Sequence, residues 1–418
     1  MSIDAAGIPQ RMAYWRTRRN LSRRELGERM QPSKSTAWVE KAESGKLADF
    51  RIGALEEVAL ALVIPIEYLL YDASPYLECV DEFETAAIRA AICRYDVTTG
   101  WFDLPVASDP VAVKLIGRQL EYGWTVFQAA QFTKVAQLLP ALIVDAARTA
   151  SVDRSDRALS NASFTYQLAV AACVKFDDAP TAWQAADRAV KAAEASQDPI
   201  TIASAARRSA EALICLSATA RPDEARRTPS DAETALDICL NAASRLDGEL
   251  RRLGADGLSM AGSLFLKAAV CAATLADKSR TTELIAQADE YATMIGHDGN
   301  AVRSGFGPTN VALHRASTLI MLEEGGLAVK AARGIGRGAF ARLPTERRVN
   351  HLAELAIAHI QCGNRDAALD ALLRAEDTAR QEVHCRPRTR STVARLLDAD
   401  PAPSNRLREL AQRSGVPV

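Results

Sequence analysis

Residues 21–45 constrain the fold of this chain more than any other stretch, because they predict two short helices joined by a tight turn. Ser22 follows an apolar residue and precedes Glu25 by three positions, which is the pattern of a capping box at the start of a helix. Leu26 and Met30 are four residues apart and give this first helix one buried stripe.

The turn and the second helix follow directly. Pro32 cannot continue a helix, so the turn is expected at residues 31–33. Val39 and Ala42 supply the inward face of the second helix, and Gly45 ends it. Two short helices in this order predict a helix-turn-helix, the motif that places its second helix in the major groove of DNA.

Basic residues are concentrated around the same motif. Residues 11–34 hold eight Lys and Arg against two Glu, whereas the formal net charge of the 418-residue chain is −1. Local positive charge is what contacts to DNA phosphates require. The alternative is a solvated Arg-rich helix without a partner. The basic residues are Arg11, Arg16, Arg18, Arg19, Arg23, Arg24, Arg29 and Lys34.

Residues 9–71 resemble the Cro/cI-type (XRE) DNA-binding domain, a five-helix bundle. The resemblance rests on Arg16, Leu21, Ser22, Glu25, Leu26, Val39, Ala42, Glu43, Ser44, Gly45, Leu55, Val58, Ala59, Leu62, Pro65, Tyr68, Leu69 and Leu70. Two departures are a turn that is about two residues longer than in phage repressors and Gln31 in place of a common glycine.

The resemblance implies a set of DNA-contacting residues. Thr36, Ala37 and Lys41 are expected to face base edges, and Arg23 a phosphate. It also implies that Arg16 pairs with Glu43. Trp38 is expected to pack rather than to read bases, because it has one donor and a large apolar area. The predicted DNA-binding residues are Arg23, Lys34, Ser35, Thr36, Ala37 and Lys41.

The rest of the chain predicts only helices. A chain of 418 residues is too long for one core, and we expect a DNA-binding domain at 1–75 and a helical domain at 76–418. Breaks such as 177–180 and 198–199 separate helical stretches of similar length. The predicted helices are 82–94, 109–122, 126–149, 153–174, 179–197, 199–217, 229–250, 257–276, 279–295, 309–323, 326–335, 345–361, 364–381, 387–398 and 404–413.

One predicted hairpin has the residue spacing of a tetratricopeptide repeat. Small and large apolar residues fall where the 34-residue repeat places its packing pairs. These residues are Leu352, Leu355, Ala356, His359, Ala368, Leu372 and Ala375. The fold class is therefore predicted as all-α, with a tetratricopeptide-like α-solenoid of helical hairpins after the DNA-binding domain.

Three further segments resemble the helical sensor domains of large actinobacterial XRE regulators. They are Gly123–Phe127, Phe306–Arg315 and Leu343–Arg348. In the second, Thr309 is expected to be an N-cap, so that Asn310 and His314 share one helix face. The alternative is that these two side chains satisfy each other or a neighbouring helix end. The predicted ligand-binding residues are Asn310, His314, Arg315, Trp124, Trp183 and Tyr166.

No catalytic, metal or cofactor site is predicted. His351 and Glu354 lack the second His that a zinc peptidase motif needs, and His359 lies eight positions after His351. Gly334, Gly336 and their neighbours follow no strand, so a phosphate-binding loop is not expected. We find no nucleophile elbow, no Cys-x-x-Cys, no export signal and no apolar run long enough for a membrane span, and we expect a cytoplasmic protein that is not an enzyme.

Together these features predict a homodimeric transcription regulator that binds a double-stranded DNA operator. Its helical domain is expected to dimerise the protein and to sense a small-molecule or peptide effector. Two alternatives remain open: a ligand-independent repressor whose repeats recruit a protein partner, and a scaffold whose helix-turn-helix does not bind DNA.

Overall fold

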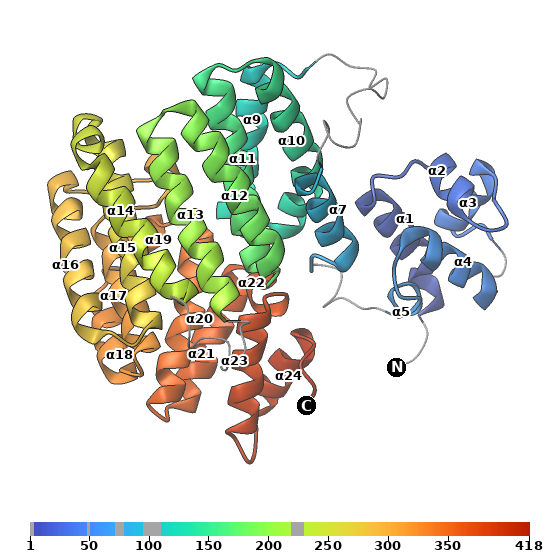
Figure 1. Ribbon diagram of the computed structural model, residues 1–418. Coiled ribbons are helices and arrows are strands. Elements are labelled where there is room, and N and C mark those ends of the chain that lie inside the picture. The colour runs from blue at the N-terminus through green and yellow to red at the C-terminus, as the bar shows by residue number, and fades with distance from the viewer. Residues whose placement is uncertain (1–3, 48–50, 72–78, 95–109, 219–229) are drawn as a thin grey trace. The chain divides into compact units, whose positions relative to one another are not determined.

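A computed structural model describes residues 4–47, 51–71, 79–94, 110–218 and 230–418 of the chain. Every regular element of these residues is a helix (Figure 1), so the all-α prediction is confirmed. The chain divides into two compact units, Met1–Cys79 and Val80–Val418. The predicted boundary between residues 75 and 76 lies outside the described residues.

The first unit is a small bundle with one apolar core. Trp15, Leu26 and Val39 are fully buried at its centre, and Met30 and Ala42 pack beside them as their spacing predicts. Trp38 is half-buried against this core, as expected for a packing residue. The helices are η1 (Ala5–Gly7), α1 (Ile8–Arg18), α2 (Arg23–Arg29), α3 (Thr36–Glu43), α4 (Ile52–Leu62) and α5 (Glu67–Leu70).

Local capping defines where α2 and α3 begin. Ser22 and Glu25 form the predicted capping box, with each side chain accepting a hydrogen bond from the other residue's backbone N–H. Ser35 caps α3, since its Oγ accepts from the Trp38 N–H at 3.2 Å. The turn between the helices is fixed to α2 by a hydrogen bond from the Lys34 N–H to the Gly27 carbonyl oxygen, 2.9 Å.

Three of the arginines counted as DNA-facing charge are buried. Arg11 donates to the Leu69 carbonyl oxygen at 2.7 Å. Arg19 donates to the Leu62 carbonyl oxygen at 2.8 Å, and Arg18 lies over the Trp15 ring at 4.8 Å. These guanidiniums fasten helix ends and cover the core. Part of the basic charge of residues 11–34 is therefore used within the protein, by Arg11, Arg18 and Arg19.

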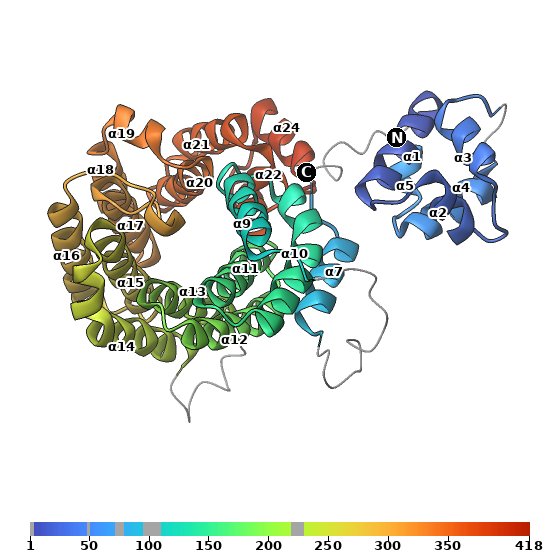
Figure 2. The same cartoon turned by 90° about the horizontal axis from the view of Figure 1, so that it is seen from above.

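The second unit is a double layer of helices that curves round a hollow (Figure 2). Successive helices pack against each other, and alternate ones face inward. The inner helices are α9 (Val113–Gln128), α11 (Asp156–Lys175), α13 (Pro199–Ser217), α15 (Gly254–Thr274), α17 (Pro308–Met321) and α20 (Thr345–Gln361). The outer helices are α10 (Phe132–Val152), α12 (Ala179–Ser196), α14 (Asp231–Arg252), α16 (Lys278–Ile295), α18 (Gly325–Arg333) and α21 (Arg365–Thr378). The remaining elements are α7 (Glu82–Ile92), η3 (Ala301–Arg303), α19 (Arg337–Arg342), α22 (Arg380–His384), α23 (Pro387–Asp398) and α24 (Asn405–Arg413).

Most predicted helices are confirmed to within a few residues, but one break is wrong. A break was expected near Gly123, yet α9 runs through this position. A Cβ at Gly123 would lie 2.7 Å from Leu168 Cδ2, so the glycine permits close helix packing instead of ending the helix. The short helices α19 and α22 were not predicted. The hairpin of α20 and α21 packs through five of the seven expected residues, Leu352, Ala356, Ala368, Leu372 and Ala375. Leu355 instead packs against α17 and α18, so its expected place between the two helices is wrong.

Polar contacts join the two ends of the curved row. Gln381 of α22 accepts from the Phe132 N–H at 2.7 Å and so caps α10, whose own N-cap residue supplies no side-chain bond. Lys175 Nζ of α11 lies 2.6 Å from Glu346 Oε1 and 2.8 Å from Glu382 Oε1. Helix α9 also packs against α20. The row of hairpins in this unit is therefore closed into a ring.

In the described part of the chain, two helices are long and apolar enough to cross a membrane by length and hydropathy, which corrects the expectation that no run qualifies. They are α10 and α15. In the structure α10 packs against α9 and α11, and α15 packs against α14 and α16.

Candidate functional site

Helix α3 presents one face to the core of the first unit and the opposite face outward. Val39 and Ala42 are buried, whereas Thr36, Ala37 and Lys41 are exposed on the outer face. The exposed side chains comprise a hydroxyl, a methyl group and an ammonium, all of which contact base edges in protein–DNA complexes. The structure thus brings together the three residues expected to face bases.

The other three predicted DNA-binding residues have contacts within the protein. The hydroxyl of Ser35 caps α3. Lys34 Nζ lies 3.6 Å from Glu57 Oε2 and 5.8 Å from the centre of the Trp38 ring. Arg23 donates from Nε to Glu43 Oε2 at 2.8 Å, with its side chain 45% exposed. Arg23 is therefore oriented by Glu43 and still reaches solvent.

Glu43 connects the three helices of this region. It accepts from Arg16 Nε at 2.5 Å, which confirms the predicted pair, and from Arg23. Its side chain is 3% exposed. Burial alone would raise the pKa of Glu43, but the hydrogen bonds from Arg16 and Arg23 hold it below its usual value. The charged carboxylate fixes α3 against α1 and the start of α2.

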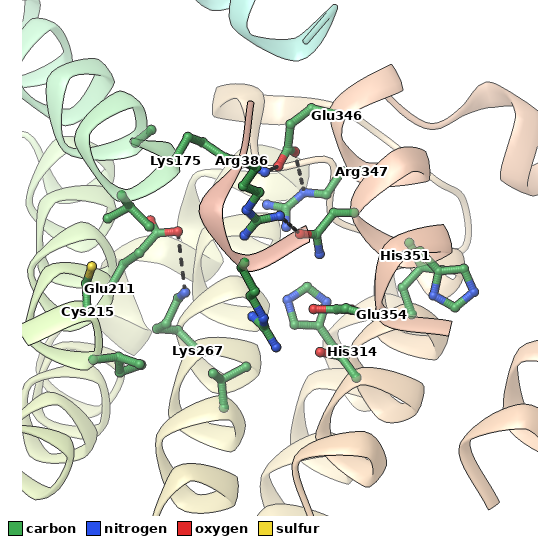
Figure 3. A pocket seen from close by; sticks show the side chains of 18 of the residues that line it. Lys175, Glu211, Cys215, Lys267, His314, Glu346, Arg347, His351, Glu354 and Arg386 are labelled. Carbon is green, nitrogen blue, oxygen red and sulfur yellow. Dashed lines mark hydrogen bonds and ion pairs between the residues drawn. The ribbon is translucent and has the colours of Figure 1, made fainter. Parts of the chain in front are cut away.

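The second unit encloses a cavity of about 320 Å³ at the centre of its inner helices. Figure 3 shows Lys175, Glu211 and Lys267 facing it from one side and Glu346, Arg347 and His314 from the other. An apolar part of the wall is formed by Trp124, Phe127, Ile214, Val270, Leu313 and Met321. The cavity combines an apolar wall with convergent polar groups, the usual character of a ligand site.

Three of the six predicted ligand-binding residues line this cavity, namely Trp124, Asn310 and His314. The other three do not line it. Tyr166 is buried in the hydrophobic core with Arg188 6.0 Å from its ring centre. Trp183 is 38% exposed on the outer helix α12, and Arg315 pairs with Asp289 at 3.6 Å.

Helix α17 starts one residue earlier than predicted. Gly307 occupies the N-cap position and Pro308 the first helical position, so Thr309 is not the cap. Instead, Asp298 accepts from the Thr309 N–H at 2.8 Å and from its hydroxyl at 2.6 Å. A carboxylate from outside the helix thus serves the free N–H at its start. Asn310 remains in the first turn, facing the cavity.

His314 is held as a neutral ring. Its Nδ1 lies 2.9 Å from the Asn310 carbonyl oxygen, which can only accept, so Nδ1 carries the proton and Nε2 is an acceptor. Burial, followed by the nearby charge of Arg347, lowers the pKa of His314 to about 3. The ring therefore provides a polar contact without adding charge.

Basic side chains outnumber acidic ones around the cavity. The lining contains seven Lys and Arg against four Asp and Glu. Burial would raise the pKa of both Glu211 and Glu346, yet the surrounding cations hold both below the usual value. Behind the wall, burial and the adjacent Arg208 lower the pKa of Arg207 to about 9. Cations therefore surround Glu211 and Glu346. Burial alone would lower the pKa of Arg386, on the same wall, but Glu382, Glu346 and Glu354 hold it above its usual value.

Several buried polar atoms of the lining have no hydrogen-bond partner within the described part of the chain. They are Trp124 Nε1, Arg208 Nε, Arg303 Nε, Asn310 Oδ1 and His351 Nδ1. Arg303 is half-buried, and the other four residues are between 2% and 6% exposed. Buried polar atoms are nearly always paired, so these atoms mark side chains whose hydrogen bonding the wall itself does not complete.

The charged part of the cavity wall was not predicted. Lys175, Glu211, Lys267, Glu346 and Arg347 come from four helices separated by long stretches of sequence. Only one signal was present, since the Leu343–Arg348 segment stood out but was not assigned to the site. Among the described residues, no group of three or more His, Cys, Asp or Glu side chains is placed to hold a metal ion.

In comparisons with known proteins, no family model matches the sequence and no curated protein matches it.

Proposed function

We propose that this protein is a sequence-specific DNA-binding transcription regulator that senses an effector through its helical unit. In this proposal α2 and α3 form a helix-turn-helix of the Cro/cI type, and the curved hairpins form a tetratricopeptide-like solenoid. The observation that carries the proposal is the outer face of α3, where Thr36, Ala37 and Lys41 are exposed while Glu43 fixes the last turn of the helix to Arg16 and Arg23.

A homodimer on a two-fold-related operator completes the proposal, because one helix-turn-helix reads too few base pairs for useful specificity. The helical unit would dimerise the protein, and the cavity would bind a small molecule or peptide. Such a ligand changes DNA occupancy only when it binds two conformations of the dimer with different affinity. The protein would act in the cytoplasm on double-stranded DNA.

Selection of duplexes from a random pool by the full-length protein tests the DNA-binding part. The expected result is an enriched, two-fold-related sequence whose affinity falls as salt concentration rises. Lys41→Ala should weaken binding to the selected sequence by ~1–3 kcal/mol and leave binding to random duplex nearly unchanged. Arg23→Ala should weaken both alike.

Other outcomes separate the alternatives. Equal losses on both duplexes for Lys41→Ala would assign this side chain to a phosphate. An absence of any salt-dependent DNA affinity would contradict the proposal and favour the scaffold alternative. Operator binding that no cavity ligand alters would favour a repressor whose repeats recruit a protein.

A further inference from the structure

We propose that the central cavity binds a small organic anion, with its carboxylate or phosphate group against the basic wall and its apolar body against Trp124 and Phe127. This inference rests on the proposed sensing function and names the chemical class of the effector. It can be tested without DNA, because the cavity lies wholly within the second unit.

The first argument is the charge left after the ion pairs of the wall are assigned. Glu346 is held by Lys175 at 2.6 Å. Glu211 contacts Arg208 and lies 3.7 Å from Lys267 Nζ. Arg347 is 3.8 Å from Glu346, which is already paired with Lys175.

The remaining charges of the wall complete this count. Within the described residues the exposed Arg388 has no ion pair, and neither do the half-buried Glu354 and the exposed Asp177. Two acids outside the lining, Glu121 and Glu382, pair with lining arginines. Even with both of them included, seven cations face six carboxylates, so one positive charge stays unneutralised. A bound anion would neutralise it.

The second argument is the position of the Arg208 guanidinium beside the Trp124 ring. Trp124 Nε1 and Arg208 Nε carry N–H groups and can only donate. Both residues are at least nine-tenths buried, and the Arg208 guanidinium lies 5.2 Å from the centre of the Trp124 ring. Neither nitrogen is exposed to the cavity, so the Arg208 guanidinium would attract a carboxylate or phosphate through its charge and not through this N–H.

Two neutral groups extend the site beyond the anion. Asn310 has an unpaired side-chain oxygen, and His314 offers Nε2 as an acceptor. Both therefore suit a hydroxyl or N–H group elsewhere on the same molecule. A volume of about 320 Å³ is at the lower end of ligand sites, which limits the occupant to a small molecule.

The experiment compares two dyes of the same shape with the full-length protein. Anilinonaphthalene sulfonate carries an anionic group, and phenylnaphthylamine lacks it. The anionic dye is expected to bind the unaltered protein at least about tenfold more tightly. Phenyl phosphate and benzoate are expected to displace it, and benzyl alcohol is not. The better of the two acids identifies the preferred anionic group.

Variants locate the binding site. Arg347→Gln should lower the affinity for the anionic dye by about tenfold and leave the affinity for the neutral dye unchanged. Arg315→Gln is the matched control, because Arg315 lies on α17 outside the cavity. Equal affinity for the two dyes, or equal losses in the two variants, would overturn the inference. The dye comparison on the unaltered protein remains decisive where a variant does not fold.

The outcome is independent of DNA binding. Specific, salt-dependent DNA binding with no preference for the anionic dye would overturn this inference and leave the proposed regulator intact. Anion binding without DNA affinity would support the cavity assignment and contradict the proposed regulator.

Discussion

Gly27 of α2 and the carbonyl group of Lys34 approach so closely that a Cβ atom at position 27 would lie 2.2 Å from the carbonyl oxygen. No heavy atom can occupy that position without moving the backbone of the turn. The separation of α2 and α3 is therefore set by the absence of a side chain at one residue.

Gly27→Ala is expected to lower the free energy of unfolding of the first unit by about 2–3 kcal/mol, because the turn must shift away from α2. Gly53→Ala is the matched control. Gly53 lies in α4, and a Cβ atom there would have nothing within 4 Å, so this change should stabilise the unit by about 0.5–1 kcal/mol. Hydrogen exchange of the α2, α3 and α4 amides in the full-length protein measures both. Equal effects of the two changes would contradict the close approach.

Glu43→Gln is expected to destabilise the first unit by about 3 kcal/mol, since it removes the buried charge that compensates Arg16. Arg23→Gln should cost less than about 1 kcal/mol, because Arg23 is well exposed and Glu43 keeps its bond to Arg16. Denaturant unfolding followed by hydrogen exchange in α1 and α3 measures the free-energy losses of the Glu43→Gln and Arg23→Gln variants. Replacing Arg16 and Glu43 together by apolar residues should recover much of the loss. Small and equal losses of unfolding free energy in Glu43→Gln, Arg23→Gln and the double variant would mean that the pair of Arg16 and Glu43 behaves as an exposed ion pair.

Arg19→Gln is expected to act on stability and not on DNA. Arg19 donates to the Leu62 and Val63 carbonyl oxygens at the end of α4, where Val63 adopts a left-handed conformation with φ 53°. Loss of these bonds should cost about 2 kcal/mol. Arg19→Gln should leave the salt dependence of DNA binding unchanged. Arg29 is exposed at the end of α2, and Arg29→Gln should reduce the slope of log affinity against log salt concentration by about one. A reduced slope in Arg19→Gln would instead assign Arg19 to a phosphate.

The sequence predicted several helix starts correctly, although not that of α17, where Thr309 is not the cap. Asp178 and Asp198, in two predicted breaks, cap α12 and α13 through bonds to N–H groups three residues later. The sequence was misleading at positions whose role depends on packing against distant residues. Gly123 permits contact with another helix, and the side chain of Arg19 is used at a helix end 43 residues away. Neither partner can be identified from neighbouring residues.

The candidate ligand site shows the same division. Asn310 and His314 were found because a helix places residues four apart on one face. Lys175 and Glu382 are 207 residues apart, and nothing local indicates that they meet. The polar contacts of the cavity wall depend on the closure of the whole ring, which no short stretch of sequence encodes.

Asn310→Ala is expected to leave the stability unchanged within about 0.5 kcal/mol or to raise it, because the buried amide oxygen has no partner to lose. The variant should still dimerise and bind the operator but should no longer respond to the effector. Denaturant unfolding and operator titrations with and without the anionic dye measure the two effects. A loss of about 2 kcal/mol or more would show that Asn310 is a structural residue.

His314 is expected to make the protein less stable in mild acid. Its folded-state pKa of about 3 lies below the ordinary value of 6.5, so the unfolded chain binds the proton more tightly. Its contribution to stability is present at pH 7 and is lost as the pH falls, by up to about 2 kcal/mol at pH 5. Urea unfolding at the two pH values should therefore show a smaller difference for His314→Gln than for the unaltered protein. Identical differences would contradict a buried, neutral ring.

The closed ring also determines how the helical unit can move. In a row of helical hairpins with two free ends, small rotations at each interface between neighbouring hairpins change the superhelical pitch. Here Gln381 fastens the start of α10, and Glu382 fastens Lys175 at the end of α11. Because the ring is closed, a rotation at one interface between hairpins must be compensated at the other interfaces. A displacement of one hairpin would thereby be distributed round the whole ring and not confined to one pair of helices.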